Sequence, residues 1–86
     1  MNEPDTFIAT ITDDGRSFQD DMELPSDMPI SELCRHIMMI LKERHGDTFS
    51  TWNECSLVCN NKLLKDDDTL LKAGIFDGSV ISVREK

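Results

Sequence analysis

The sequence has no long run of apolar residues. Its longest, Ile37 to Leu41, spans five residues, whereas a membrane-spanning helix needs about 20. The N-terminal segment MNEPDTF is acidic and has no apolar core, which argues against a secretory signal peptide. We therefore expect a cytoplasmic protein with no segment inserted in a membrane, or a piece of a larger protein.

Basic residues are also scarce. Nine Lys and Arg stand against 17 Asp and Glu, which gives a formal net charge of −8. Phosphate backbones and anionic lipids repel such a surface, so we expect no binding to nucleic acids or to lipid headgroups. A basic protein partner is compatible with this charge.

Cysteines are too few and too irregularly spaced for a disulfide framework. The three, Cys34, Cys55 and Cys59, are an odd number. Together with His36 and His45 they could suggest zinc, but there is no Cys-x-x-Cys pair and no His-x3-His pair. We therefore predict reduced cysteines in the core, with no metal and no other cofactor.

No catalytic pattern is present. Cys34 and His36 are two positions apart on a predicted helix, so they point in different directions and cannot pair. There is no Ser-His-Asp pattern and no Gly-rich phosphate loop. The acidic run 66–68 lacks the spacing of a calcium loop and is typical of a solvated turn that caps the next helical segment. We predict that the protein is not an enzyme.

The first part of the chain predicts a β-hairpin. Residues 6–12 alternate between two faces, and residues 17–24 return as the second strand. The Asp-Gly pair that ends at Gly15 is a hairpin signal, because glycine accepts a positive φ. Asp20 falls on the apolar face of the second strand, which places it at an exposed edge or beside a bulge.

A change of period then marks one amphipathic helix, residues 29–45. Glu32 in the first turn and Arg44 in the last suit the helix dipole, and Gly46 provides a stop. Residues 47–54 are predicted to form a loop. The apolar stripe follows the i, i+3, i+4 spacing of one helical face: Ile30, Leu33, Cys34, Ile37, Met38 and Leu41.

The remaining residues predict three short strands. Turns at Asn60-Asn61 and Asp77-Gly78 and a brief helical turn at 69–73 separate them. The strands are residues 56–60, 62–65 and 80–84. The whole chain, 1–86, thus predicts one α+β domain with a mixed four- to five-stranded sheet packed on one helix. Residues 1–5 are predicted to form a disordered N-terminal extension.

Two runs of residues resemble ubiquitin. PSDMPISELCRHI resembles the segment that leads into its central helix, and LVCNNKLLKDDDTLLKAGIFDGSVISV resembles the second half of ubiquitin-like domains. The similarity extends from Phe7 to Val83. It implies a β-grasp, ubiquitin-like roll, a fold that serves many functions.

Among ubiquitin-like groups, the chain is most similar to the small YukD/EsaB-type proteins, which are cytoplasmic accessory factors of type VII secretion. The shared features are the Pro-Ile-x-x-Leu start of the helix (29–33), the long loop before the third strand and the Ile-x-Asp-Gly turn (75–78). This resemblance implies a non-catalytic, unconjugated module for protein–protein interaction. It would contact a membrane component of the secretion machine, as a monomer or weak homodimer.

The sequence departs from ubiquitin in two places. It ends at Arg84-Glu85-Lys86 without the Gly-Gly that an activating enzyme requires, so we do not expect conjugation. At the positions of the surface that ubiquitin receptors bind, Val58 keeps an apolar side chain, but Ser82 and Arg84 replace the histidine and the aliphatic residue of ubiquitin. The alternatives are a modifier or sulfur carrier whose Gly-Gly tail is missing here, or an adaptor domain from a larger protein.

Apolar residues outside the predicted core are the best candidates for partner binding. For two of them, Phe49 and Trp52, the alternative is a loop that folds back and plugs the open end of a small core. For Met39 and Ile40 it is a widened buried stripe or a self-association face. The predicted docking residues are Met39, Ile40, Phe49, Trp52, Val58 and Phe76.

Overall fold

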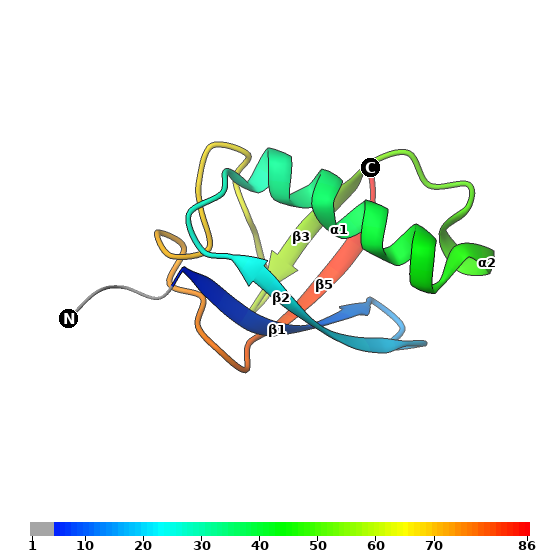
Figure 1. Cartoon of the computed structure of the whole chain (residues 1–86), viewed down its shortest axis with the longest axis horizontal. Helices are drawn as coiled ribbons and strands as arrows, with labels where there is room; N and C mark the ends of the chain where they lie inside the picture. Colours follow the sequence, from blue (N-terminus) through cyan, green and yellow to red (C-terminus); the bar gives the residue numbers. More distant parts are fainter. Residues whose placement is uncertain (1–4) are drawn as a thin grey trace.

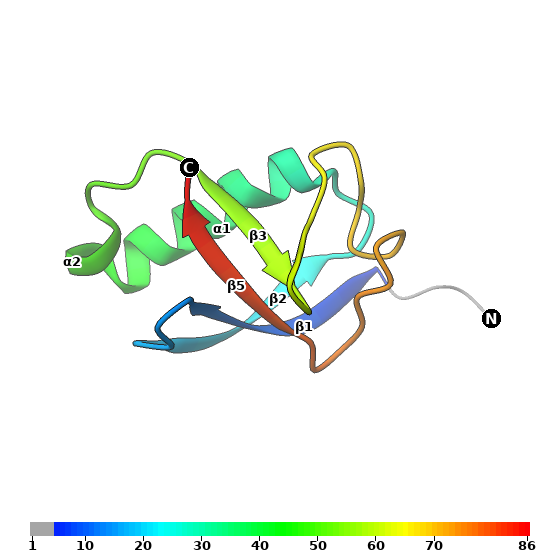
Figure 2. The same ribbon diagram turned by 180° about the vertical axis from the view of Figure 1, so that it is seen from behind.

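The computed structural model describes residues 5–86, which form a curled five-stranded sheet with one long helix across its inner face (Figures 1 and 2). The strand order is β2-β1-β5-β3-β4. Neighbouring strands are antiparallel except β1 and β5, which run parallel. The elements are β1 Thr6–Asp13, β2 Gln19–Pro25, α1 Ile30–Arg44, α2 Gly46–Phe49, β3 Cys55–Cys59, β4 Lys62–Leu63 and β5 Val80–Glu85. The predicted α+β class, with a mixed sheet packed on one helix, is confirmed.

The N-terminal extension predicted at residues 1–5 lies outside the described residues except for Asp5. The carbonyl of Asp5 accepts a hydrogen bond from the Ser26 N–H at 2.9 Å. This bond joins the beginning of β1 to the end of β2.

The first turn differs from the prediction. The positive φ falls on Arg16, at 52°, and not on Gly15. Asp13 explains the shape, because its carboxylate accepts hydrogen bonds from both the backbone N–H and the hydroxyl of Ser17. These bonds close a wider loop, and β2 therefore begins at Gln19 instead of residue 17.

Helix α1 buries its predicted stripe in full; all six residues are at most 9% exposed. Its N-cap, Pro29, makes no side-chain cap. Instead, the N–H groups of Ile30 and Ser31 donate to the carbonyls of Asp68 and Asp66, at 2.8 and 3.1 Å. The acidic loop therefore satisfies the backbone donors that a helix start leaves free.

Helix α1 ends just before Gly46, as predicted, but the loop predicted after it is partly helical. The C-cap of α1 is His45, and Gly46 begins the one-turn helix α2 within the segment predicted as a loop. A link of one residue joins α1 to α2, which lies beside the C-terminal end of α1, where the chain turns back towards β3 (Figure 1). This return brings Phe49 into the core.

The later strands lie close to their predicted positions. Asn60 and Asn61 have φ angles of 53° and 63°, as a tight turn between β3 and β4 requires. Gly78, at 86°, forms the turn before β5. The brief helical turn is present as well, since the N–H of Ala73 donates to the carbonyl of Thr69 at 2.9 Å. Thr69 also caps that turn through its hydroxyl, which accepts the N–H of Lys72 at 3.1 Å.

The core lies between α1 and the inner face of the sheet. Alternate residues of each long strand point into it, as the sequence pattern predicts. The fully buried members are Ala9, Ile11, Leu24, Leu33, Ile37, Leu41, Phe49, Leu57, Leu70 and Ile81. Neither helix of residues 5–86 lies over the opposite, outer face of the sheet (Figure 2).

Candidate docking surface

The six predicted docking residues are scattered over the structure. Met39 and Phe76 are exposed. Ile40 and Trp52 are half-buried against the core, and Val58 and Phe49 are buried. Met39 lies on α1, directly opposite the buried stripe, whereas Phe76 lies in the segment that leads into β5. The six therefore do not form one patch.

Phe49 requires a correction, because its exposed fraction is 0% and it offers no surface to a partner. Its ring packs edge-on against Phe18 and Trp52, with centroid distances of 5.3 and 4.8 Å. The alternative interpretation of this loop, a plug at the open end of the core, is the one that the structure shows.

Exposed apolar side chains lie around the start of β1 instead. Ile8, Phe76 and Val80 are 53%, 62% and 45% exposed, although large apolar side chains are usually buried. We call these three residues the β1 patch.

Backbone contacts hold the β1 patch together. The N–H of Ile8 donates to the Asp77 carboxylate at 2.8 Å, and the carbonyl of Ile8 accepts the N–H of Gly78 at 2.8 Å. Val80 lies opposite Thr10, two residues along the same face from Ile8. The turn before β5 is thereby fixed against β1, and the ring of Phe76 packs edge-on against Phe7, with their centroids 6.3 Å apart.

Carboxylates border the β1 patch. Glu23 lies opposite Ile8 on the neighbouring strand, and Asp21 lies opposite Thr10. Both are exposed, as is Asp77. A complementary partner surface would combine apolar side chains with Lys or Arg at its margin.

The middle of the outer face is more polar. Val58, which is buried, lies opposite Ser82, and the neighbouring Arg84 forms an ion pair with Asp14 at 3.0 Å. Ser82 and Arg84, the two residues predicted to differ from the surface that ubiquitin receptors bind, are thus near neighbours on β5. Leu63, which is 59% exposed, lies opposite Val58 on β4, so the outer face also carries one exposed apolar side chain away from the β1 patch.

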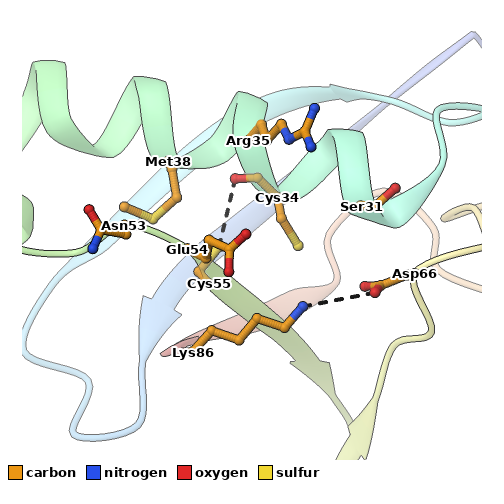
Figure 3. A pocket seen from close by; sticks show the side chains of 9 residues that line it. All are labelled: Ser31, Cys34, Arg35, Met38, Asn53, Glu54, Cys55, Asp66 and Lys86. Atoms are coloured by element: carbon orange, nitrogen blue, oxygen red, sulfur yellow. Dashed lines mark hydrogen bonds and ion pairs between the residues drawn. The ribbon is translucent and has the colours of Figure 1, made fainter.

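A groove on the other side of the molecule brings sulfur atoms together (Figure 3). It has a volume of about 200 Å³ and is lined by Cys34, Met38 and Cys55, among others. All three cysteines are free and buried in the core, as predicted. Within residues 5–86, no three His, Cys, Asp or Glu side chains are grouped closely enough to hold a metal ion.

Hydrogen bonding and burial change the acidity of these thiols. The Cys55 thiol donates a hydrogen bond to the backbone carbonyl of Cys34 at 3.7 Å. Its closeness to the Cys34 thiol lowers the pKa of Cys34, and the same contact, reinforced by burial, raises the pKa of Cys55. Burial raises the pKa of Cys59. Cys34 is therefore the most readily ionised of the three.

Sequence reasoning missed Ile8 and Val80. The alternation of residues 6–12 had already placed Ile8 on the face opposite Phe7, beside Thr10. Val80 likewise precedes the inward Ile81. An apolar residue on an otherwise polar strand face was the signal that could have identified both.

The fold is that of known secretion domains. The ubiquitin-like domain of the Mycobacterium tuberculosis type VII secretion system protein EccD1 has a TM-score of 0.74 and 24% identity, covering 91% of this chain and 96% of that one. The EccD5 ubiquitin-like domain from Mycobacterium xenopi has a TM-score of 0.72 and 14% identity, covering 96% and 99%. A chain of an ESX-5 inner membrane complex has a TM-score of 0.78 and 14% identity, covering 96% of this chain and 21% of its own length.

Neither helix in the described part of the chain has the length and hydropathy of a membrane span. No significant match was found among curated protein sequences. The family of the protein YukD, from the WXG100 protein secretion system, matches residues 8–83. The chain therefore belongs to the YukD family, and its fold is the ubiquitin-like β-grasp.

Proposed function

We propose that this protein is a non-catalytic docking module of a type VII secretion system, located in the cytoplasm, which binds a membrane component of the machine. The observation that carries the proposal is the β1 patch, three exposed apolar side chains fixed by backbone hydrogen bonds and bordered by carboxylates. Exposed apolar clusters with a polar rim are typical of protein-binding surfaces.

Of the predicted docking residues, Phe76 is part of this patch. Met39 is equally exposed, but it lies on α1, away from the patch. We therefore assign the main contact to Phe76 and Ile8, and we use Met39 as a comparison.

The similar structures support the setting. One is a ubiquitin-like domain of a type VII secretion protein, and another is part of an inner membrane complex, in which the similar region is 21% of a longer chain. A domain of the same fold that binds such a complex would need an exposed contact surface of its own. The β1 patch supplies one.

The buried position of the thiols supports a non-catalytic role. Cys34 lies beside Cys55 on the groove, and His45 is bonded to Asp20 at 3.2 Å. Neither arrangement joins a nucleophile to a base, which nucleophilic catalysis requires.

The proposal is tested by affinity capture from detergent-solubilised membranes of the native cell. The variant Ile8→Ser/Phe76→Ala removes most of the β1 patch, and Met39→Ala/Leu63→Ala is the matched control, since both of its residues are more than half exposed elsewhere. We expect the wild type and the control to capture the same secretion-system membrane protein, identified by mass spectrometry. We expect at least tenfold less of it with the patch variant.

A second readout follows secretion of WXG100 proteins in cells that carry each variant. Loss of secretion with the patch variant alone would agree with the proposal. Equal capture by the patch variant and the wild type, or a loss that follows Met39→Ala/Leu63→Ala, would contradict it.

A further inference from the structure

Strand β2 is a free edge of the sheet. In the described part of the chain it pairs with β1 on one side and with no strand on the other. A free edge carries unpaired backbone N–H and C=O groups that can bind another extended chain.

The hydrogen bonds of β1 show which β2 residues face this edge. Ile8 directs both its N–H and its C=O away from β2, towards residues 77 and 78, and Thr10 donates its N–H to Ser79 at 2.9 Å. The residues between them, at positions 7, 9 and 11, must then bond to β2, because backbone groups alternate along a strand. The β2 residues opposite Ile8 and Thr10, Glu23 and Asp21, consequently direct their backbone groups to the free edge. The same holds for Gln19, two residues before Asp21.

The same three residues have their side chains on the outer face, and all three are exposed. Asp21 accepts a hydrogen bond from the Thr10 hydroxyl at 2.7 Å, which holds its carboxylate over the sheet. Every second residue along this edge therefore directs its backbone groups to the free side, and Asp21 and Glu23 among them also carry a negative charge. A strand that pairs with this edge would be stabilised by a positive side chain at every second residue.

We propose that the β2 edge binds an extended segment of the partner protein, added as an antiparallel strand, with Lys or Arg at every second residue opposite Asp21 and Glu23. This inference rests on the proposed function, and it names the chemistry of the partner. The site is continuous with the β1 patch, because an added strand would lie about 10 Å from β1. One partner can therefore cover both.

A second copy of this chain does not fit the edge. Two β2 strands paired antiparallel about Met22 would place Asp21 of each copy opposite Glu23 of the other, and pairing about Asp21 would place the two Asp21 carboxylates opposite each other. Like charges directly across a sheet are destabilising. The charges that exclude self-pairing are those that select a basic strand.

The test is a fluorescence anisotropy titration of the whole protein with a labelled seven-residue peptide that alternates Lys and Thr. Two N-methylated forms of the peptide test the backbone contact without altering the protein. In an antiparallel added strand, the Lys residues opposite Asp21 and Glu23 direct their N–H groups to β2, whereas the Thr N–H groups point away. Methylation of the Lys nitrogens should weaken binding at least tenfold, and methylation of the Thr nitrogens less than twofold.

Charge is tested with Asp21→Asn/Glu23→Gln. Its matched control is Glu54→Gln/Asp67→Asn, which makes the same change in net charge at exposed positions outside β2. We expect at least tenfold weaker binding with the first variant and less than a twofold change with the second. The backbone amide signals of Gln19, Asp21 and Glu23 should shift on titration.

Absence of binding, equal loss with both protein variants, or no preference between the two methylated peptides would overturn strand addition. A dimer of the free protein in sedimentation experiments, broken by the peptide, would overturn the exclusion of self-pairing. The capture experiment is independent: if capture needs Phe76 but the peptide fails, docking stands and strand addition falls. If the peptide binds but the Ile8→Ser/Phe76→Ala variant captures as much partner as the wild type, the assignment of docking to the β1 patch is wrong instead.

Discussion

Asp20 of β2 and Arg44 at the end of α1 form an ion pair, with 2.7 Å between Asp20 Oδ1 and Arg44 Nη1. The second carboxylate oxygen of Asp20 lies 3.2 Å from Nε2 of His45. One side chain of the edge strand therefore holds the last turn of the helix. Asp20 interrupts the apolar face of β2 because that end of the face meets the polar end of α1 and not the core.

Loss of this carboxylate should loosen the contact between strand and helix. Asp20→Asn should lower the free energy of unfolding by about 1 kcal/mol, a modest value because Arg44 is 53% exposed and solvent weakens the pair. Urea denaturation measures the change, with the exposed Glu43→Gln as a control that shifts stability by less than about 0.5 kcal/mol. If Asp20→Asn has the same effect in an Arg44→Gln background, the ion pair is not the cause.

The aromatic plug gives a larger prediction. Phe49→Ala removes a fully buried ring between Phe18 and Trp52 and should cost about 3–5 kcal/mol of unfolding free energy. The indole of Trp52, 4.8 Å from that ring, should then be exposed to water, and its fluorescence emission should move to longer wavelength. Phe76→Ala, far from Trp52 in the chain and exposed, should leave the emission unchanged. An unshifted emission maximum in folded Phe49→Ala protein would contradict the plug.

The sequence was sufficient for the elements that periodicity controls. The six-residue stripe of α1 and the inward positions of β5 follow directly from spacing, since burial repeats every 3.6 residues in a helix and every two in a strand. The turn at Asn60-Asn61 was predictable for a similar reason, because asparagine tolerates a positive φ.

The predictions that failed depended on side-chain contacts that sequence spacing does not reveal. Gly46 ends α1 as predicted, but the segment predicted as a loop at 47–54 is partly helical, because the packing of Phe49 in the core favours a second helical turn there. Gly15 gave a valid hairpin signal, but the Asp13 carboxylate organises the turn around Ser17 and leaves the positive φ to Arg16. The β1 patch also required the fold, since only the tertiary structure brings the turn that ends at Gly78 against Ile8.

The Asp13–Ser17 contact predicts a pH dependence. The hydrogen bond from the Ser17 hydroxyl, helped by the Ser17 backbone N–H, lowers the pKa of Asp13 below its ordinary value of 3.8. A lowered pKa in the folded state means that this contribution to stability is present above pH 3.8 and is lost as the pH falls through the folded-state pKa.

Ser17→Ala should therefore raise the pKa of Asp13, which a carbon-13 NMR titration of the carboxyl measures directly. Below about pH 4, the wild type should lose more stability than Asp13→Asn, because that variant has no proton to gain there. The exposed Asp14→Asn serves as a control that leaves the titration of Asp13 in place. An Asp13 pKa at or above its ordinary value in the wild type would refute the contact.

The thiol pair on the groove makes a prediction about reactivity. Since the Cys55 thiol stabilises the Cys34 thiolate, iodoacetamide should modify Cys34 first, while Cys55 and Cys59, whose pKa values are raised, should react slowly in the folded protein. Mass spectrometry of the alkylated protein identifies the order. Cys55→Ala should move the midpoint of the pH–rate profile of Cys34 upwards, because the thiolate loses its donor, whereas Cys59→Ala should leave that midpoint in place. A Cys34 midpoint that does not change in Cys55→Ala would show that the two thiols do not interact, and the low pKa of Cys34 would then need another cause.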